Sequence, residues 1–175
     1  MNTPLNFTLN FTLNAQSVTL STAKDPDGHE RSLLDLLRNE LGLKATRLGC
    51  AQGQCGACTV IKDGQAILAC ETWISDLEGA KITTLEGLGN AHEPHPLQTA
   101  FIEVQAAQCG FCTSGIIMRS AALLEHNAKP TVKEIEAALH SNLCRCGVHE
   151  RVIKAVLLAS NGLTTTDHLP QRGTP

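Results

Sequence analysis

Hydrophobic and polar residues follow two different periods along this 175-residue chain. In residues 6–20 apolar side chains alternate with polar ones, first in a tandem Asn-Phe-Thr-Leu repeat of which one copy would suffice for a strand. A period of two predicts β-strands with one buried face. From residue 97 onward, apolar positions recur every three or four residues, which predicts amphipathic helices. We therefore expect an α+β protein in which the strands precede the helices.

The first half contains the signals of a β-grasp ferredoxin-like domain. After a turn and a surface loop within residues 22–31, Ser32 is the expected N-cap of a short helix that ends at Gly42. Two short apolar runs flank an Asp-Gly turn at residues 63–64, which predicts a β-hairpin. A last strand is expected near residues 81–85. Two strands, a helix, a hairpin and a final strand are the order expected of this fold.

Four short amphipathic helices are expected in the second half. The first has apolar positions that start at Leu97, and the second ends before Pro130. Thr131 and Glu134 form a capping box that opens the third helix, and the fourth covers roughly residues 148–159. Short helices with brief connections suggest a four-helix bundle. We expect approximate twofold symmetry between its two helical hairpins.

These patterns divide the chain into two domains, a linker and a tail. The linker is rich in Gly and Pro, and its His92 and His95 are expected to contact solvent. The tail is polar and rich in threonine. The expected bounds are 1–85 for the β-grasp domain, 86–96 for the linker, 97–160 for the helical domain and 161–175 for the tail.

Composition excludes several classes of function. Charged residues make up 18% of the chain and the formal net charge is −3, so we expect no surface for nucleic acid or for an anionic membrane. Aromatic residues make up 3%, which leaves few platforms for stacking bases. No run approaches the roughly eighteen apolar residues of a membrane span, and no signal peptide is evident. We expect a cytoplasmic protein whose eight cysteines bind metal rather than form disulfides.

Four cysteines form the most specific motif of the chain. The segment Gly49–Cys58 has the spacing C-x4-C-x2-C, and a fourth cysteine follows the hairpin. This spacing is that of plant-type [2Fe–2S] ligation. The glycines let the loop curl and point backbone N–H groups at sulfur, which offsets the negative charge of a cluster. Zinc or disulfides are the alternatives, although structural zinc favours two well-separated C-x2-4-C knuckles. The expected ligands are Cys50, Cys55, Cys58 and Cys70.

The other four cysteines form a C-x2-C pair and a C-x-C pair. Each pair is expected at the turn of one helical hairpin, beside a helix N-terminus whose dipole favours thiolate. Taken alone, the set also suits a structural zinc, and His149 lies at zinc-like spacing from Cys146. Beside a first [2Fe–2S] cluster, a second one is the better interpretation. The expected ligands are Cys109, Cys112, Cys144 and Cys146.

All eight cysteines, with the runs Gln108–Thr113 and Asn142–Cys146, make the chain resemble the small iron–sulfur subunit of the molybdenum hydroxylases, the xanthine dehydrogenase family. The likeness covers about residues 10–158. Many relatives have Thr-Gly-Tyr after the last cysteine, whereas this chain has Gly147–His149, which is similar to the isoquinoline and nicotinate dehydrogenase branch.

The resemblance implies an electron-transfer subunit of a heteromeric oxidoreductase. Two [2Fe–2S] clusters would pass electrons singly from a molybdopterin, in a dinucleotide form, on a large partner subunit to an external acceptor. That acceptor would be a cytochrome or a flavoprotein, and the substrate of the complex an N-heterocycle or an aldehyde. By the same resemblance, Gln108 would hydrogen-bond the pterin and the sulfur of Cys146 would lie next to the pterin amino group.

No catalytic residue is expected in this chain, because its few carboxylates fall at helix caps or on solvated helix faces. The alternative function is a free-standing ferredoxin-like electron shuttle with a structural zinc in the helical half. A shuttle that used the first domain alone would leave the helical half with no reason to carry four more thiols. A redox sensor would need a DNA-binding or signalling element, and neither a basic face nor a recognition helix is visible in the sequence.

Overall fold

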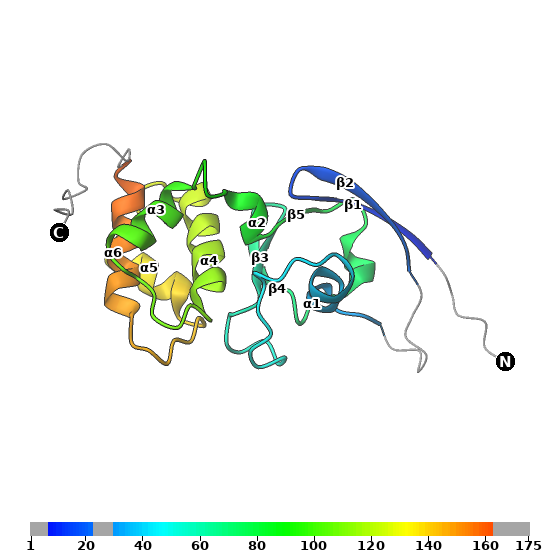
Figure 1. Ribbon diagram of the computed structural model, residues 1–175, viewed down its shortest axis with the longest axis horizontal. Helices are drawn as coiled ribbons and strands as arrows, with labels where there is room; N and C mark the ends of the chain where they lie inside the picture. The colour runs from blue at the N-terminus through cyan, green and yellow to red at the C-terminus, as the bar shows by residue number, and fades with distance from the viewer. Residues whose placement is uncertain (1–6, 23–29, 163–175) are drawn as a thin grey trace, which may run out of the picture.

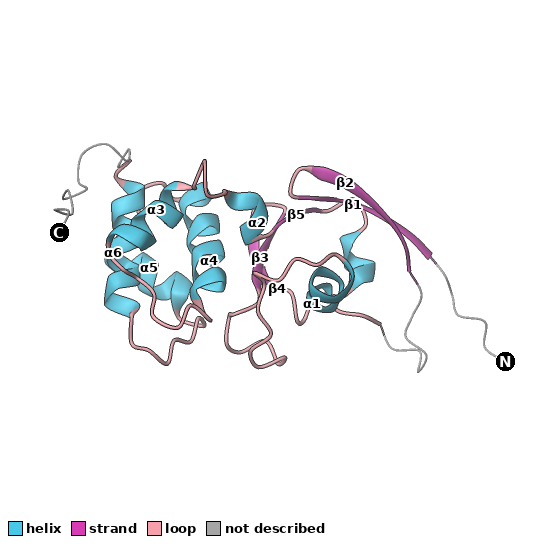
Figure 2. Cartoon of the chain, viewed as in Figure 1, coloured by secondary structure: helices cyan, strands magenta, loops and turns pink. Residues whose placement is uncertain are grey.

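The computed structural model describes residues 7–22 and 30–162. The molecule is elongated, with a sheet-bearing half that follows the N-terminus and a helical half that precedes the C-terminus (Figure 1). Most of the loop predicted at residues 22–31, including its turn, and nearly all of the predicted tail lie outside the described residues. Among the described residues, the strands lie in the first half and most helices in the second (Figure 2), as the change of hydrophobic period predicts.

A five-stranded mixed sheet forms the first half, in the order β2-β1-β5-β3-β4. Neighbouring strands are antiparallel except β1 and β5, which are parallel. Residues 7–13, which are both copies of the tetrapeptide repeat apart from Asn6, lie in β1 and pair with β2, so the strand uses more than the single copy that would suffice. The strands are β1 (Phe7–Leu13), β2 (Gln16–Thr22), β3 (Thr59–Lys62), β4 (Gln65–Leu68) and β5 (Lys81–Thr83).

The helix predicted after Ser32 begins as expected and then widens. The Ser32 hydroxyl accepts a hydrogen bond from the Asp35 backbone N–H, so it caps α1 (Leu33–Asp35). The next turn, η1 (Leu36–Glu40), is a π-helix. Leu36 and Leu37, adjacent in sequence, are both fully buried in this turn and pack with the apolar side chains of the strands. An amphipathic pattern of leucines does not distinguish this packing from a regular α-helix.

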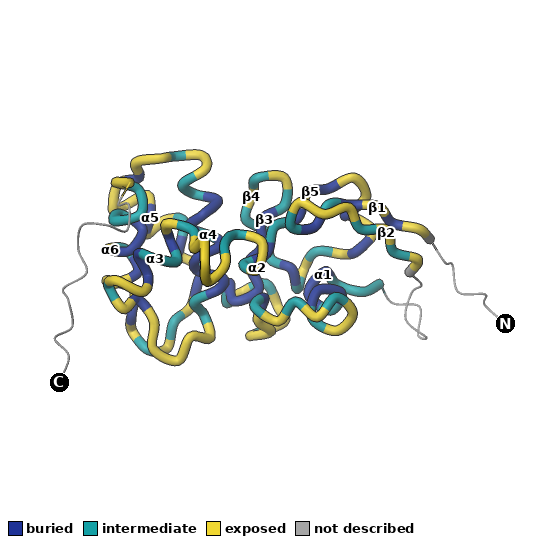
Figure 3. The backbone as a smooth tube through the Cα atoms, turned by 45° about the horizontal axis from the view of Figure 1, so that its top comes forward, coloured by how far each residue is buried: buried dark blue, intermediate teal, exposed yellow. Residues whose placement is uncertain are grey.

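Four longer helices and a four-residue helix, α2, follow the sheet. The helix α4 lies against β3 and β4 and joins the two halves (Figure 3). Ile61 of β3 belongs to the same apolar cluster as the buried side chains of the helices, whereas the remaining buried strand residues pack with α1 and η1. The helices are η2 (Ile74–Leu77), α2 (Leu85–Leu88), α3 (Pro96–Glu103), α4 (Thr113–His126), α5 (Val132–Leu139) and α6 (His149–Ser160).

The helices α3 and α5, which precede the two cysteine-bearing turns, each begin at a side-chain cap. The predicted capping box of α5 is confirmed, since Thr131 and Glu134 each bond the backbone N–H of the other. The expectation of a solvated His95 is wrong: this residue is half-buried and caps α3, with its Nδ1 accepting from the Leu97 N–H at 3.2 Å. Burial lowers the pKa of His95, which favours the neutral ring that this cap requires. Within residues 7–22 and 30–162, no helix has the length and apolar character to cross a membrane.

Candidate metal centres

The first four thiols come together because the β3–β4 hairpin reverses the chain. Cys58 immediately precedes β3, and Cys70 comes two residues after β4. The Asp63-Gly64 turn has positive φ at both positions, as a tight hairpin turn requires. The Ala69 backbone N–H then donates to the Cys58 carbonyl oxygen at 3.2 Å. The fourth cysteine is thereby brought beside the third, as the sequence predicts.

The loop before β3 points backbone N–H groups at sulfur. The N–H groups of Gln52 and Gln54 donate to Cys50 Sγ at 3.4 and 3.3 Å. These two donors lower the pKa of Cys50 to about 7, so its thiolate form is favoured. The loop reaches this shape through left-handed backbone angles at Ala51 and Gly53. An anionic sulfur with preformed N–H donors fits a ligand of a negatively charged cluster.

The sulfurs of this first site are arranged as two couples. Cys50 and Cys55 lie close enough for Cys55 to affect the pKa of Cys50, and Cys58 and Cys70 are related in the same way. Burial, followed by the interaction with the Cys70 side chain, raises the pKa of Cys58 to about 12. Among the described residues, no three His, Cys, Asp or Glu side chains surround one point as ligands of a single ion would. Two couples fit the two irons of a [2Fe–2S] cluster, which each take two thiolates.

The thiols of the second site are also arranged in two couples, and they lie at or before the N-termini of α4 and α6. Cys112 is the N-cap residue of α4, and Cys144 and Cys146 lie just before α6, whose N-cap is Val148. The couples are Cys112 with Cys144 and Cys109 with Cys146. Each couple takes one thiol from each helical hairpin. The structure therefore places these thiols as two neighbouring pairs, and their binding of one cluster stays a prediction.

Backbone donors and burial act on the second set as well. The Phe111 N–H, followed by the Cys146 side chain, lowers the pKa of Cys109. Burial, followed by the Cys144 side chain, raises the pKa of Cys112 to about 12. Burial also acts to raise the pKa of Cys144, but hydrogen bonds led by the Val148 N–H outweigh it and leave that pKa lowered. As in the first site, backbone N–H groups lower the pKa of some of the thiols, while burial raises the pKa of another.

The two thiol-bearing loops are hydrogen-bonded directly to each other. The Leu143 backbone N–H donates to the Cys55 carbonyl oxygen at 3.0 Å, and Asn142 Nδ2 donates to the Gly56 carbonyl oxygen at 3.1 Å. Both loops lie on the same side of the molecule in Figure 1. Cys144 directly follows Leu143 in the chain. No layer of side chains separates the backbones of the two sites, which the sequence alone does not reveal.

The remaining predicted site residues lie at the second site or close to it. Gln108 is exposed and directly precedes Cys109. The imidazole Nε2 of His149 lies 3.4 Å from the Asn142 carbonyl oxygen, so this ring is directed at the backbone rather than at sulfur. The position of the ring therefore gives no support to His149 as a zinc ligand. The proposed pterin contacts of Gln108 and Cys146 stay predictions.

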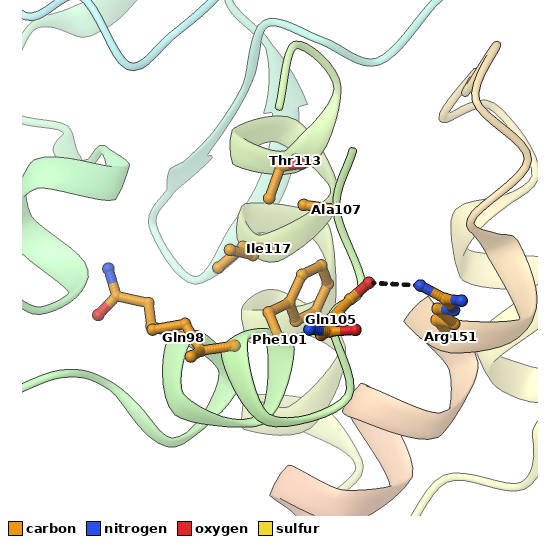
Figure 4. A pocket seen from close by; sticks show the side chains of 8 residues that line it. Gln98, Phe101, Gln105, Ala107, Thr113, Ile117 and Arg151 are labelled. Carbon is orange, nitrogen blue, oxygen red and sulfur yellow. Dashed lines mark hydrogen bonds between the residues drawn. The ribbon is translucent and has the colours of Figure 1, made fainter. Parts of the chain in front are cut away.

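A separate cavity of about 620 Å³ lies between α3, α4 and α6 (Figure 4). Its walls include Phe101, Ile117 and Arg151, and Arg151 donates to the Gln105 carbonyl oxygen at 3.4 Å. None of the eight cysteines lines it. The cavity is therefore distinct from both thiol sites, although Thr113 in its wall adjoins Cys112.

Comparisons with known proteins agree with this geometry. Residues 18–85 match the family described as "2Fe-2S iron-sulfur cluster binding domain", and residues 84–157 match the "[2Fe-2S] binding domain" family. A nicotinate dehydrogenase subunit of Pseudomonas putida is 45% identical over 153 residues, which are 87% of this chain and 94% of that protein. The alpha subunit of isoquinoline 1-oxidoreductase of Brevundimonas diminuta is 42% identical over 148 residues, 85% of this chain and 94% of the relative.

Solved structures show the same fold. A chain of quinoline 2-oxidoreductase from Pseudomonas putida 86 matches with a TM-score of 0.81 and 32% identity, over 89% of this chain and 94% of that one. Aldehyde oxidoreductase from Desulfovibrio gigas matches with a TM-score of 0.83 and 39% identity. That match covers 88% of this chain but only 17% of the longer enzyme. The same fold thus makes up nearly all of one of these chains and a small part of the other.

Proposed function

Because this chain belongs to the iron–sulfur subunits of the xanthine dehydrogenase family, we propose that it carries electrons singly from a molybdopterin-bearing large subunit to an external acceptor. The observation that carries this proposal is the direct hydrogen bonding between the two thiol-bearing loops, at Leu143 and Cys55 and at Asn142 and Gly56. Two sites joined in this way suit a relay better than two independent structural metals.

We propose that each group of four thiols holds one [2Fe–2S] cluster. The arrangement in couples and the N–H donors at Cys50, Cys109 and Cys144 support this ligation. When bound, a [2Fe–2S] cluster accepts or returns one electron. The ligands would be Cys50, Cys55, Cys58 and Cys70 in the first site and Cys109, Cys112, Cys144 and Cys146 in the second.

The residues of the chain set the conditions for this relay. Backbone N–H groups that point at sulfur stabilise negative charge, and burial of Cys58 and Cys112 shelters part of each site from water. The hydrogen bond from Leu143 to Cys55 fixes the separation of the two loops. It also provides a short connection through backbone atoms from Cys144 to Cys55.

We propose that the large subunit covers the exposed rim of the second site. Two large apolar side chains next to its cysteines in the chain, Phe111 and Leu143, are 46% and 64% exposed. They adjoin a site whose Cys109 is also exposed. Within that interface, Gln108 would hydrogen-bond the pterin and Cys146 would lie next to it. The cofactor would be held by the large subunit in a dinucleotide form.

The first site would then face the acceptor. Exposed Leu48 and Trp73 lie two and three residues from Cys50 and Cys70, and they give this end apolar surface for a cytochrome or a flavoprotein. The names of similar proteins refer to nicotinate, isoquinoline and aldehydes. We infer that the complex oxidises an N-heterocycle, with an aldehyde as the second substrate class.

The proposal also includes the finer architecture. We divide the chain into a β-grasp domain at residues 1–85, a linker at 86–96, a helical domain at 97–160 and a tail at 161–175. The formation of each sulfur couple from both helical hairpins supports an approximate twofold relation between α3–α4 and α5–α6. The short helix α2 lies at the start of the linker.

Metal analysis of the full chain, purified with its partner, tests the proposal. Two clusters require about four irons and four labile sulfides per chain. A free-standing shuttle with structural zinc would instead give about two irons and one zinc. The match of residues 84–157 to a [2Fe–2S] binding domain favours the first result. Copurification with a large molybdenum protein is the accompanying expectation, and isolation as an active monomer would contradict it.

A further inference from the structure

A second cavity, of about 290 Å³, lies between β4 and the helices α4 and α5. None of the eight cysteines lines it, and it shares no lining residue with the cavity of about 620 Å³. Four of its lining residues, Arg119, Ala122, Leu123 and His126, occupy one face of α4 because they are spaced by three or four positions. The cavity is therefore a separate feature of the fold, on the side of α4 that packs against the β3–β4 hairpin.

Arg119 is the only arginine, lysine or carboxylate residue among those that line this cavity. It is half-buried, and its Nη1 donates to the Ala66 carbonyl oxygen of β4 at 3.4 Å, which is long for a hydrogen bond. Its Nε is buried and has no hydrogen-bond partner. The ion pairs within residues 7–22 and 30–162 are made by Arg31, and none involves Arg119. This guanidinium thus lacks the compensation that buried cations normally have.

Part of the guanidinium is accessible to a ligand. Among the nitrogens of Arg119, Nε alone is both buried and unpaired, and Nη2 has no hydrogen bond to the described residues. The unpaired Nη2 is therefore not buried, and Arg119 contributes to the cavity wall. Gln65 of β4, in the same wall, carries a side-chain amide that also donates hydrogen bonds. A ligand in the cavity thus meets donors from two elements of the fold.

The rest of the wall is apolar or already paired. Ala122, Leu123 and Ala138 form a hydrocarbon wall. His126 Nε2 lies 3.0 Å from the Gly64 carbonyl oxygen, and because a carbonyl oxygen only accepts, this nitrogen donates. The contact directs the imidazole ring at the turn of the hairpin. A cation beside a hydrocarbon wall suits an anion that carries an apolar body.

A nearby carboxylate restricts the charge of that anion. Glu125 Oε2 is 3.8 Å from the position that a Cβ atom on Gly64 would take, so its negative charge lies at the hairpin turn. Glu125 does not line the cavity, and six positions separate it from Arg119, which places the two on different faces of α4. A single arginine balances one negative charge, and Glu125 disfavours a second. A carboxylate also matches the planar fork of a guanidinium.

We propose that this cavity binds a small organic monocarboxylate, whose carboxylate group accepts from Arg119 and whose carbon body packs against the hydrocarbon wall. The volume of about 290 Å³ is far above the roughly 10–15 Å³ that a cavity needs to hold one water molecule, so a molecule of several heavy atoms fits. Binding is non-covalent, so no bond forms or breaks and no electron moves. The site goes beyond the proposed relay, because it requires neither cluster and no cysteine lines it.

Titration of the iron-loaded full chain with benzoate, followed by ligand-observed nuclear magnetic resonance, tests the proposal. We expect saturable binding with a Kd on the order of 1 mM. Benzamide has nearly the same shape without the charge, and it should bind about tenfold more weakly. Inorganic phosphate should not displace benzoate at equal concentration. Absence of saturable benzoate binding, equal binding of benzamide, or displacement by phosphate would overturn the proposal.

Two variants locate the binding in this cavity. Arg119→Gln removes the charge and should weaken benzoate binding about tenfold. Ala138→Leu should weaken it at least as much, because the larger side chain from α5 occupies the space of the ring. The matched control is Arg151→Gln, which removes the same charge from the wall of the other cavity and should leave the Kd within about twofold. Equal weakening in Arg119→Gln and Arg151→Gln would contradict the site.

The same titration of the complex with the large subunit distinguishes a free carboxylate from one carried by a partner. The Kd should be unchanged in the complex. Loss of benzoate binding there, with retention in the free chain, would indicate that a carboxylate side chain of the partner fills the cavity, and would overturn a small-molecule site.

Thermal unfolding and iron content are measured on the same samples. If Arg119→Gln does not fold, unweakened benzoate binding by a folded Ala138→Leu protein overturns the proposal. Iron content keeps this test separate from the proposed function. Benzoate binding by a protein without about four irons refutes only the ligation of the clusters, whereas absent binding by a fully loaded protein refutes only this site.

Discussion

Gly115 of α4 lies against the carbonyl oxygen of Gly56, so closely that a Cβ atom on Gly115 would be 2.1 Å from that oxygen. The first turn of α4 therefore touches the loop of the first site along its backbone. Because Cys112 caps the same helix, this contact joins a ligand of the second site to the loop of the first. The absence of a side chain at Gly115 is what permits the approach.

Replacement of Gly115 by Ala should force the two loops apart. Overpacking of this kind costs about 1–3 kcal/mol of unfolding free energy, although alanine is otherwise the better helix former. Electron transfer between the sites should slow because the loops separate. Thermal unfolding of the iron-loaded protein measures the first effect, and rapid-mixing reduction the second. Glu125→Ala, at an exposed position of the same helix, is the control and should change neither.

Asn142 gives a second test of the contact between the loops. Its Nδ2 donates to the Gly56 carbonyl oxygen, while its buried Oδ1 has no partner. Asn142→Asp would place a buried carboxylate beside that carbonyl and should cost about 3 kcal/mol. Asn142→Leu should cost only about 1 kcal/mol, because Thr59 still donates to the Gly56 oxygen. Chemical denaturation of the two variants should separate them, and equal losses would contradict this assignment of the hydrogen bond.

The sequence predicts the parts of the fold that depend on local pattern. The alternation in β1, the hairpin turn at Asp63 and the capping box of Thr131 are all present, because each follows from neighbours in the chain. The cysteine spacing likewise predicts that Cys70 lies beside Cys58, because the hairpin between them reverses the chain. Local pattern does not predict the π-helical turn at Leu36, since its leucines suit two kinds of helix equally well.

Contacts between distant segments account for the features that the sequence does not reveal. Arg119 shows no pattern that separates it from a surface cation, and only the packing of α4 on β3 buries it. The hydrogen bond from Leu143 to Cys55 joins residues that lie far apart in the chain. His95 has the pattern of a solvated residue between two prolines until the helix that it caps is in place.

His95 should make stability depend on pH. Its Nδ1 accepts from the Leu97 N–H, so protonation removes the cap of α3. Because burial lowers the pKa of folded His95 below that of the unfolded chain, the folded state binds fewer protons. This contribution to stability is complete above the ordinary histidine pKa and is lost as pH falls through the lowered folded value.

Thermal unfolding between about pH 7.5 and pH 5.5 measures this effect. The wild type should lose stability as pH falls, and His95→Asn should lose less, because asparagine is a good N-cap that does not titrate. His92→Asn is the control at an exposed position and should behave as the wild type does. A His95→Asn protein with the pH dependence of the wild type would show that this residue is not the source.

Metal content combined with electron paramagnetic resonance of the reduced full chain tests the two-cluster relay most directly. We predict about four irons and no zinc per chain, with two reduced-cluster signals that broaden each other because the sites adjoin. In Cys144→Ala one signal and the mutual broadening should disappear, while the first-site signal remains. A chain that holds zinc between Cys109, Cys112, Cys144 and Cys146, or that gives a single signal unaffected by Cys144→Ala, would contradict the relay.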